Sequence, residues 1–164
     1  DSVFDIILNF LILMAICYMS KTTIWFCLLA FIGIQLQGTL YNYYYVILRN
    51  KSVGGDSTSK VFEYKSPKAL PGETQKSVDI LFGIYTIVYG AFDKIIHFLD
   101  KDAYKVKTFS NWFMTLLSLY GLGFQLLIIA IMLPLGWIEF IVPFFIAYTM
   151  LIFVLIAIRK TVII

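Results

Sequence analysis

The sequence carries little charge for its length. Only 14% of its 164 residues are Asp, Glu, Lys or Arg, whereas 60% are hydrophobic and 18% are aromatic. Soluble domains carry about 25% charged residues, and a small soluble core cannot hide this much apolar surface. The composition therefore excludes an ordinary soluble domain. It predicts an all-α integral membrane protein, with the bilayer as solvent for most of the apolar surface.

Cysteine and histidine are also scarce. Cys17 and Cys27 both fall inside apolar runs, so we expect two small buried hydrophobic side chains rather than a disulfide or a metal pair. The single histidine, His97, is interpreted as an ordinary helix residue rather than a ligand. The chain has no initiator Met and opens without the features of a secretory signal. We therefore expect it to start inside a longer natural chain.

Four hydrophobic runs are long enough to cross a hydrocarbon core of about 30 Å, which takes roughly 20 helical residues. They lie within a single membrane domain over residues 1–164. The second run ends in four tyrosines within residues 41–45, which is typical of an aromatic belt at a membrane interface. The predicted spans cover about 3–20, 23–48, 111–133 and 137–158.

The region 49–110, between the second and third spans, has a different composition. Its first part is polar and contains Gly, Ser and Pro turn signals, and it is too long to be a minimal connection. In the segment 79–99, polar or small residues recur every three or four positions. This spacing favours an amphipathic helix in the membrane interface over a fifth span.

The positive charges support the same topology. Of the 13 Lys and Arg residues, ten lie between Arg49 and Lys107, two follow the last span, and only Lys21 lies in the first turn. If the segment 79–99 does not cross, twelve of the 13 positive charges share one side, as the positive-inside rule prefers for the cytoplasm. We therefore predict a bundle of four transmembrane helices plus one interfacial helix.

Asp1 and Asp5 stand one turn apart at the head of the first span, so their side chains share a face. Carboxylates at a helix N-terminus interact favourably with the helix dipole and could simply mark where the helix meets water. However, Asp5 already has apolar neighbours, and Asn9 continues the same face. A carboxylate at depth in a membrane helix usually faces a polar cavity, a partner or a metal. The residues alone leave both interpretations open.

The pattern Asp-x-x-x-Asp at the head of a membrane helix resembles the closing half of the signature of CDP-alcohol phosphotransferases (CDP-alcohol phosphatidyltransferases). That signature reads Asp-x-x-Asp-Gly-x-x-Ala-Arg, a short gap, then Gly-x-x-x-Asp-x-x-x-Asp. Asp1 and Asp5 match its third and fourth aspartates, and everything before them is missing here. The layout of the following spans also agrees, and the run 43–52 resembles bacterial members. The resemblance would make the chain the C-terminal portion of a six-helix enzyme.

The resemblance implies a phospholipid-biosynthesis transferase, which moves a substituted phosphate from a CDP-linked donor to an alcohol acceptor and releases CMP. It implies Asp1 as a ligand of Mg²⁺ (or Mn²⁺) and Asp5 as the general base. It also implies a bacterial cytoplasmic membrane with the active site facing the cytoplasm, and a homodimer, which the family often forms. We expect no nucleic-acid partner.

Arg49 and Lys51, just beyond the second span, are further candidates for substrate binding, because a basic cluster can hold a phosphate. The same residues also read as topology signals. The sequence leaves the donor and acceptor open. Two non-catalytic interpretations also remain: a four-helix subunit or assembly factor that docks through the region 49–110, and a transporter fragment, which the scarcity of charge deep in the spans disfavours.

Overall fold

The computed structural model describes residues 2–51, 65–106 and 108–162, and every regular element in this part of the chain is helical. This confirms the all-α prediction. In chain order the elements are α1 (Ser2–Met19), α2 (Ile24–Lys51), α3 (Gln75–Leu99), the 3-10 helix η1 (Lys101–Lys105), α4 (Asn111–Ser118), α5 (Leu122–Met132) and α6 (Ile138–Val162).

Helix length and hydropathy identify an integral membrane protein. By these criteria α2, α3 and α6 are each able to cross a membrane, and α4 with α5 can form one further, bent span. The 18-residue α1 rises about 27 Å at about 1.5 Å per residue, close to the hydrocarbon thickness of about 30 Å. Large apolar side chains such as Trp25 and Phe153 are more than half exposed, as expected where lipid is the neighbour.

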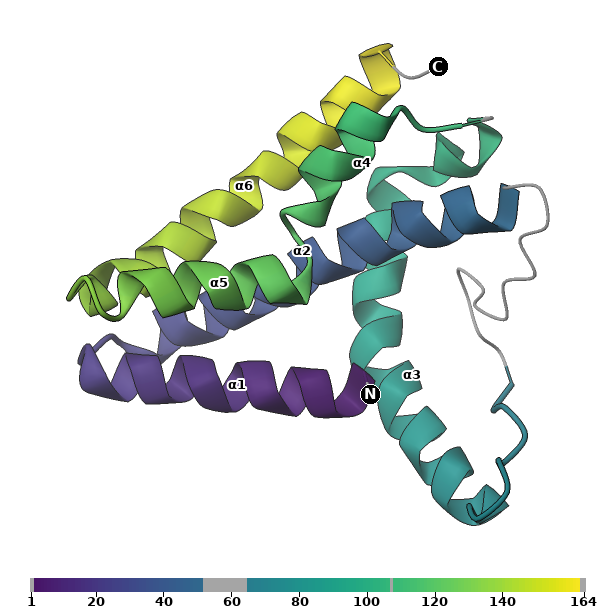
Figure 1. Ribbon diagram of the computed structural model, residues 1–164, viewed down its shortest axis with the longest axis horizontal. Helices are drawn as coiled ribbons and strands as arrows, with labels where there is room; N and C mark the ends of the chain where they lie inside the picture. The colour runs from purple at the N-terminus through teal and green to yellow at the C-terminus, as the bar shows by residue number, and fades with distance from the viewer. Residues whose placement is uncertain (1, 52–64, 107, 163–164) are drawn as a thin grey trace.

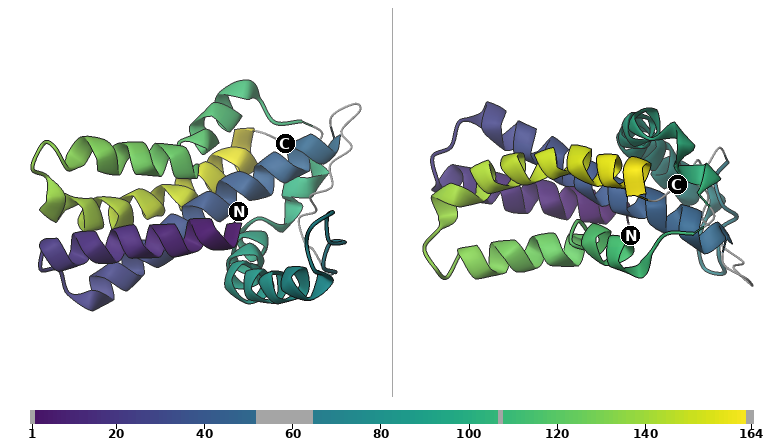
Figure 2. Two further views of the ribbon diagram at one scale, coloured as in Figure 1. Left: turned by 60° about the horizontal axis from the view of Figure 1, so that its bottom comes forward. Right: turned by 90° about the horizontal axis from the view of Figure 1, so that it is seen from above.

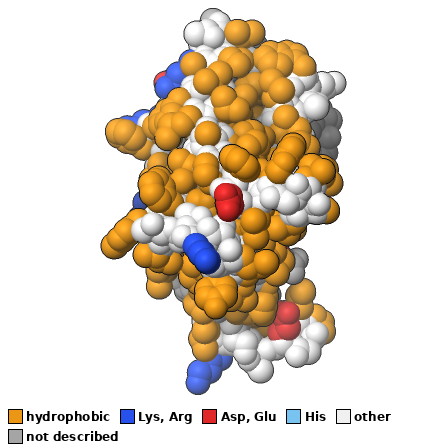
Figure 3. Space-filling model, turned by 90° about the vertical axis from the view of Figure 1, so that its left-hand side faces the viewer, with side chains coloured by type: hydrophobic (Ala, Val, Ile, Leu, Met, Phe, Trp, Pro, Cys, Tyr) orange, Lys and Arg blue, Asp and Glu red, His pale blue; other side chains and the backbone are white. Residues whose placement is uncertain are grey.

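The helices α1, α2, α5 and α6 run lengthwise beside one another (Figures 1 and 2). The turns that join α1 to α2 and α5 to α6 lie at one end of the bundle, and each contains a residue with positive φ, Lys21 at 54° and Gly136 at 74°. Side chains at this end are mostly hydrophobic, with few charged groups (Figure 3). The segments rich in lysine and arginine gather at the opposite end.

The third predicted span, over about 111–133, is formed by two helices, α4 and α5, which can cross a membrane together as one bent span. The chain bends by 51° between α4 and α5. Gly121 is the N-cap of α5, and a Cβ atom built on it would lie 3.1 Å from the Ser118 carbonyl oxygen and 3.8 Å from the Tyr41 ring. A hydropathy profile reports the length of an apolar run and does not reveal a bend within it.

The helix α3 runs crosswise to the bundle, at the end where α1 begins (Figure 1). It packs against α2 and α1, yet only 6% of the residues in its most apolar 18-residue stretch are buried. Apolar side chains such as Ile87 (78% exposed) and Phe98 (71%) remain on its surface. Although α3 is long enough to span a membrane, its direction favours the predicted interfacial helix.

The tyrosines at the end of α2 do not form the predicted aromatic belt. Tyr43 and Tyr44 are buried, at 5% and 0% exposure, and only Tyr45 is open at 42%. The Tyr44 ring makes edge-to-face contacts with Phe109 and Phe113. The chain that follows α3 folds back onto α2 and supplies these two phenylalanines. The sequence pattern within residues 41–45 cannot reveal their contact with Tyr44.

Cys17 and Cys27 are joined by a disulfide, which the sequence analysis did not expect. Both cysteines are buried as predicted. The tight turn at Lys21 brings the end of α1 back against the start of α2, so that the two Cα atoms lie 6.2 Å apart despite ten residues of separation. This distance lies within the usual range for a disulfide.

Candidate functional site

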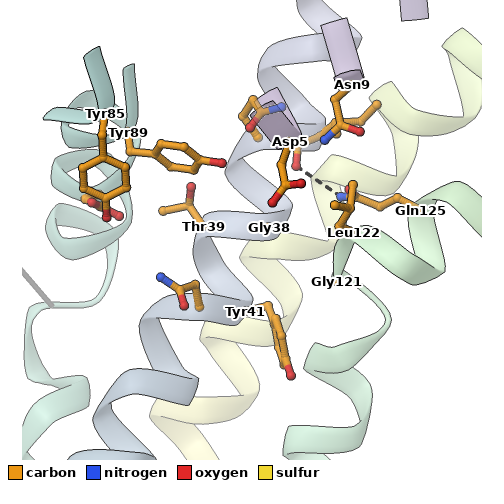
Figure 4. A pocket seen from close by; sticks show the side chains of 14 residues that line it. Asp5, Asn9, Gly38, Thr39, Tyr41, Tyr85, Tyr89, Gly121, Leu122 and Gln125 are labelled. Carbon is orange, nitrogen blue, oxygen red and sulfur yellow. Dashed lines mark hydrogen bonds between the residues drawn. The ribbon is translucent and has the colours of Figure 1, made fainter. Parts of the chain in front are cut away.

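A polar pocket of about 320 Å³ lies where α1 begins, between α2, α3 and the junction of α4 with α5 (Figure 4). Carboxylates, amides and hydroxyls make up most of the side chains around it. The lining residues are Asp5, Asn9, Ile34, Gln35, Gly38, Thr39, Tyr41, Asn42, Tyr85, Tyr89, Asp93, Gly121, Leu122 and Gln125.

Asp5 lies in the first turn of α1 and is partly buried. Its carboxylate points into the same space as the Tyr89 hydroxyl and the Thr39 side chain (Figure 4). Asn9 lies one turn further along the same face of α1 and also lines the pocket. Tyr89 is within electrostatic range of both the Asp5 and the Asp93 carboxylates. Two carboxylates from different helices, Asp5 of α1 and Asp93 of α3, therefore line the same pocket as Tyr89.

Two buried polar groups of α2 belong to residues that line this pocket and have no hydrogen-bond partner in the described part of the chain. They are the Gln35 Nε2 atom and the Thr39 hydroxyl, on side chains that are each 4% exposed. A buried polar group without a hydrogen bond costs about 1–3 kcal/mol. Both atoms have less than 1 Å² of accessible surface, so a molecule in the pocket reaches them only if the lining moves.

A network of buried amides stabilises the pocket wall that α2 and α5 form. Gln125 of α5 donates from Nε2 to the Ile34 carbonyl oxygen (3.1 Å) and to Gln37 Oε1 (3.0 Å). Gln37, which is fully buried, donates in turn to Thr149 Oγ1 (2.9 Å) and to the Phe145 carbonyl oxygen (3.3 Å). These bonds tie α2, α5 and α6 together inside the membrane, where no water competes for the amides.

The remaining wall of the pocket comes from α3. Tyr85, Tyr89 and Asp93 recur every four residues, so they share one helix face. The rings of Tyr85 and Tyr89 stack with centroids 5.1 Å apart, which leaves the Tyr89 hydroxyl to point into the pocket (Figure 4). Asp93 belongs to the polar or small residues that recur every three or four positions over 79–99, although it was not singled out as a site residue, and the two tyrosines lie outside that pattern.

The C-terminal end of α3 is fixed by a buried ion pair. Asp100, with no exposed surface, pairs with Arg159 of α6, and its Oδ2 accepts hydrogen bonds from Arg159 Nε (2.6 Å) and the Tyr44 hydroxyl (2.5 Å). Tyr43 donates to the Asp100 carbonyl oxygen at 3.0 Å. The face of α3 that lines the pocket is thereby held in register with α2 and α6.

Of the residues singled out from the sequence, Asp5 lines the pocket, and Asp1 lies outside the described residues. Arg49 and Lys51 are at the end of α2 and are not among the lining residues. The Lys51 ammonium donates to the carbonyl oxygens of Tyr104 and Val106. In this structure Lys51 therefore fastens the segment after α3 to the end of α2.

Sequence reasoning missed Gln35, Thr39 and Asp93. A polar residue in the middle of an apolar run is the signal that could have found the first two, because such residues are expensive in lipid and usually face an interior. Asp93 was visible as the one carboxylate within the last three turns of the amphipathic segment. Nothing in the sequence places it near Asp5, since α3 reaches α1 only through the tertiary fold.

The pocket contains two carboxylates, the ligand type that magnesium prefers. Asp5 and Asp93 offer the carboxylate oxygens that this ion prefers, but no group of three or more His, Cys, Asp or Glu residues occurs within residues 2–51, 65–106 and 108–162. Mg²⁺ is often held by one or two carboxylates together with substrate phosphates and water. The donor set is therefore compatible with magnesium and is not a complete cage for it.

The chain matches no protein-family model, no curated protein and no solved structure. A functional proposal therefore has to rest on the geometry of the pocket and on the aspartate pattern.

Proposed function

We propose that the chain is part of a membrane CDP-alcohol phosphotransferase, which transfers a substituted phosphate from a CDP-linked donor to an alcohol and releases CMP. The observation that carries the proposal is the position of Asp5. The residue to which the signature assigns proton abstraction lies in the first turn of α1 and also lines a polar pocket (Figure 4). A carboxylate beside room for a substrate hydroxyl supports the proposal that Asp5 is the base.

The proposed reaction is a displacement at phosphorus. The Asp5 carboxylate takes the proton of the acceptor hydroxyl as its oxygen attacks the phosphorus that carries the transferred group. The bond between that phosphorus and the bridging oxygen of the pyrophosphate breaks, and CMP leaves with the bonding electron pair. The Tyr89 hydroxyl, which points into the pocket (Figure 4), is the proposed hydrogen-bond partner that orients the attacking hydroxyl.

Asp1, one turn before Asp5, is the proposed ligand of Mg²⁺ or Mn²⁺, together with aspartates of the missing first half of the signature. A bound divalent ion supplies charge neutralisation on the phosphoryl oxygens. Arg49 and Lys51 remain proposed phosphate ligands at the end of α2. Arg49 is the stronger of the two, because Lys51 already donates to two backbone carbonyls.

We also propose a location in a bacterial cytoplasmic membrane with the pocket facing the cytoplasm. Supporting this orientation, the pocket lies toward the end of the bundle where α2 and α6 end in Arg49, Lys51, Arg159 and Lys160. The turn that contains Lys21 lies at the other end. Such an asymmetry of positive charge is what the positive-inside rule describes.

The substitution Asp5→Asn in the complete natural protein tests the proposal. Because general-base catalysis contributes about 10²–10⁴-fold, we expect a loss of that size in magnesium-dependent CMP release, with membrane insertion unchanged. Chelation of divalent ions should abolish CMP release by the unsubstituted protein.

Glu139→Gln is the matched control, because it removes a carboxylate in the first turn of α6, outside the pocket lining. It should leave CMP release unaltered. Full activity of the Asp5→Asn protein would exclude Asp5 as the base.

A further inference from the structure

A second pocket, of about 350 Å³, lies between the start of α2 and the middle of α6, and we call it the α2–α6 groove. Six of its seven lining residues are apolar, among them Phe26 of α2 and Pro143 and Met150 of α6. The seventh is Thr22, whose hydroxyl is hydrogen-bonded to the Ser20 hydroxyl at 2.7 Å. The lining therefore offers a bound molecule hydrophobic contact rather than hydrogen bonds.

The α2–α6 groove has the depth of one leaflet of a membrane. It starts near the turns at one end of the bundle, where Trp25 (75% exposed) and Trp137 (51%) lie, and tryptophan is enriched at membrane interfaces. Met150, at the other end of the groove, follows the start of α6 at Ile138 by 12 residues, a rise of about 18 Å. One leaflet of the hydrocarbon core is about 15 Å thick, so the groove has the length of one lipid acyl chain.

Two charged residues of opposite sign lie where the groove starts. Lys21 is the neighbour of Thr22 in the turn before α2, and Glu139 stands four and seven residues before Pro143 and Ile146, on the α6 face that lines the groove. Both side chains are exposed, and within the described residues neither charged group has an ion pair or a hydrogen bond. Figure 3 shows an acidic and a basic side chain near one another on this largely hydrophobic end of the molecule.

This pair of charges matches a lipid headgroup that carries both a phosphate and an ammonium group. The Lys21 ammonium can bind the phosphate, and the Glu139 carboxylate can accept hydrogen bonds from the ammonium group. Pro143 has no N–H, so the Glu139 carbonyl oxygen lacks the usual helix hydrogen bond from residue 143 and is a second acceptor at the same place. A trimethylated ammonium has no N–H to donate, and a headgroup without an ammonium would leave Glu139 without a cation.

We propose that the α2–α6 groove binds a phospholipid whose headgroup carries a primary ammonium. One acyl chain lies along Pro143 and Met150, the phosphate contacts Lys21, and the ammonium contacts Glu139. The groove is at the end of the bundle opposite the basic segments and shares no lining residue with the polar pocket around Asp5. The proposal therefore does not rest on the proposed function.

The first experiment measures which lipid the protein retains. The complete natural protein, stripped of lipid in detergent, is incubated with equal amounts of phosphatidylethanolamine, phosphatidylcholine and phosphatidylglycerol that carry the same acyl chains. Native mass spectrometry then counts the bound lipids. We expect phosphatidylethanolamine to exceed each of the other two about two- to fivefold, the range that exposed ion pairs supply. Equal retention of the three lipids would show ordinary boundary lipid and would overturn the proposal.

The second experiment separates the two headgroup contacts. In Glu139→Gln the ammonium loses its anion, so the ratio of bound phosphatidylethanolamine to phosphatidylglycerol should fall to about one. Lys21→Gln removes the phosphate contact that the lipids share, so the retention of both should fall while their ratio stays above one.

Glu73→Gln is the matched control, because Glu73 is also exposed and lies just before α3, outside the groove lining. It should leave the lipid ratio unaltered. An unaltered ratio in Glu139→Gln would count against the proposal, as would an equal change in both variants.

The third experiment fills the groove itself. Ala147 is exposed and lines the groove, so Ala147→Phe should displace the acyl chain and lower the retention of phosphatidylethanolamine. Ala15→Phe, which adds the same ring at an exposed position of α1 outside the lining, should leave the retention unchanged. The melting temperature in detergent shows that each variant is folded. If Ala147→Phe removes dimers from the mass spectrum and leaves the bound lipid unchanged, the groove is an interface between two copies of the chain and the lipid proposal fails.

Discussion

At the scale of single residues, Asp100 shows how strongly the packing of several helices can depend on one buried charge. It has no exposed surface, and its charge is compensated by Arg159 and by the hydroxyl of Tyr44. Such a pair contributes little compared with well-packed apolar residues, but removal of one partner leaves the other charge buried and unpaired. The stability of the α3–α6 junction is therefore sensitive to either residue.

We expect Arg159→Met to lower the free energy of unfolding by about 3–5 kcal/mol, because the Asp100 carboxylate would remain buried without its cation. Thermal unfolding in detergent, followed by circular dichroism, measures the change.

Lys105→Met provides the comparison, since it also removes a cation paired with an aspartate. The Lys105–Asp102 pair is more than 60% exposed on both sides, so water can replace the lost partner, and no measurable loss is expected. Equal losses in the two variants would show that the Asp100–Arg159 pair gains nothing from its burial.

The single residues were only partly predictable. The spacing of Asp1 and Asp5 pointed to Asp5, and the structure places Asp5 in a polar pocket. Asp100 and Arg159 could not be paired from the sequence, because 59 residues separate them and no local pattern links the end of an amphipathic helix to the end of a distant span. The disulfide was missed for a different reason: Cys17 and Cys27 lie only ten residues apart, but the apolar runs predict burial, which does not reveal bonding.

At the scale of elements, α2 and α6 approach each other closely at Gly33. A Cβ atom there would lie 2.2 Å from Thr149 Oγ1, which itself accepts a hydrogen bond from Gln37. Gly33 thus allows two helices to approach so that a buried amide can bridge them, as small residues often do in membranes.

Gly33→Ala should destabilise the bundle by about 1–3 kcal/mol, the typical effect of overpacking. Adding Thr149→Ala removes the clashing oxygen, so the double variant should lose less stability than the sum of the single variants. Gly38→Ala, whose added Cβ would meet nothing within 4 Å, is the control on the same helix. Strict additivity of the two changes would refute the contact.

The hydrophobic helices were the easiest elements to predict, because the length of an apolar run indicates directly whether lipid or water surrounds it. The bend between α4 and α5 was missed because Gly121 acts through its contacts with Ser118 and Tyr41, not through hydropathy. For α3, the polar stripe and the placement of lysines suggested an interfacial helix, and its crosswise direction in the structure favours the same interpretation.

Cysteine labelling can determine whether α3 crosses the membrane. If it lies in the interface, Lys76→Cys and Lys101→Cys, near its two ends, should both react with an impermeant maleimide from the same side. Lys21→Cys should react from the opposite side. Reaction of the first two from opposite sides would show that α3 spans the bilayer.

At the scale of the whole molecule, the disulfide and the distribution of charge give the same orientation independently. Cys17 and Cys27 flank the turn at the end opposite the basic segments. Disulfides persist in oxidising compartments, and positive charge marks the cytoplasmic side. The turn at Lys21 should accordingly face the oxidising side of the membrane.

In cells, Cys17 and Cys27 should therefore resist a thiol-reactive polyethylene glycol reagent until a reductant is added, as a gel shift would show. Cys27→Ala should also cost about 2–3 kcal/mol of stability for a closed loop of this length. Free thiols in freshly prepared membranes would contradict this orientation.

The crosswise position of α3 has a further consequence. One wall of the pocket belongs to α3, whose apolar side chains Ile87 and Phe98 are largely exposed and not covered by the described part of the chain. If this face rests on lipid, the packing of the leaflet and the attraction of anionic lipids for Lys94 and Lys101 contribute to the free energy of the pocket. A change in bilayer composition would then shift the pocket wall that α3 forms.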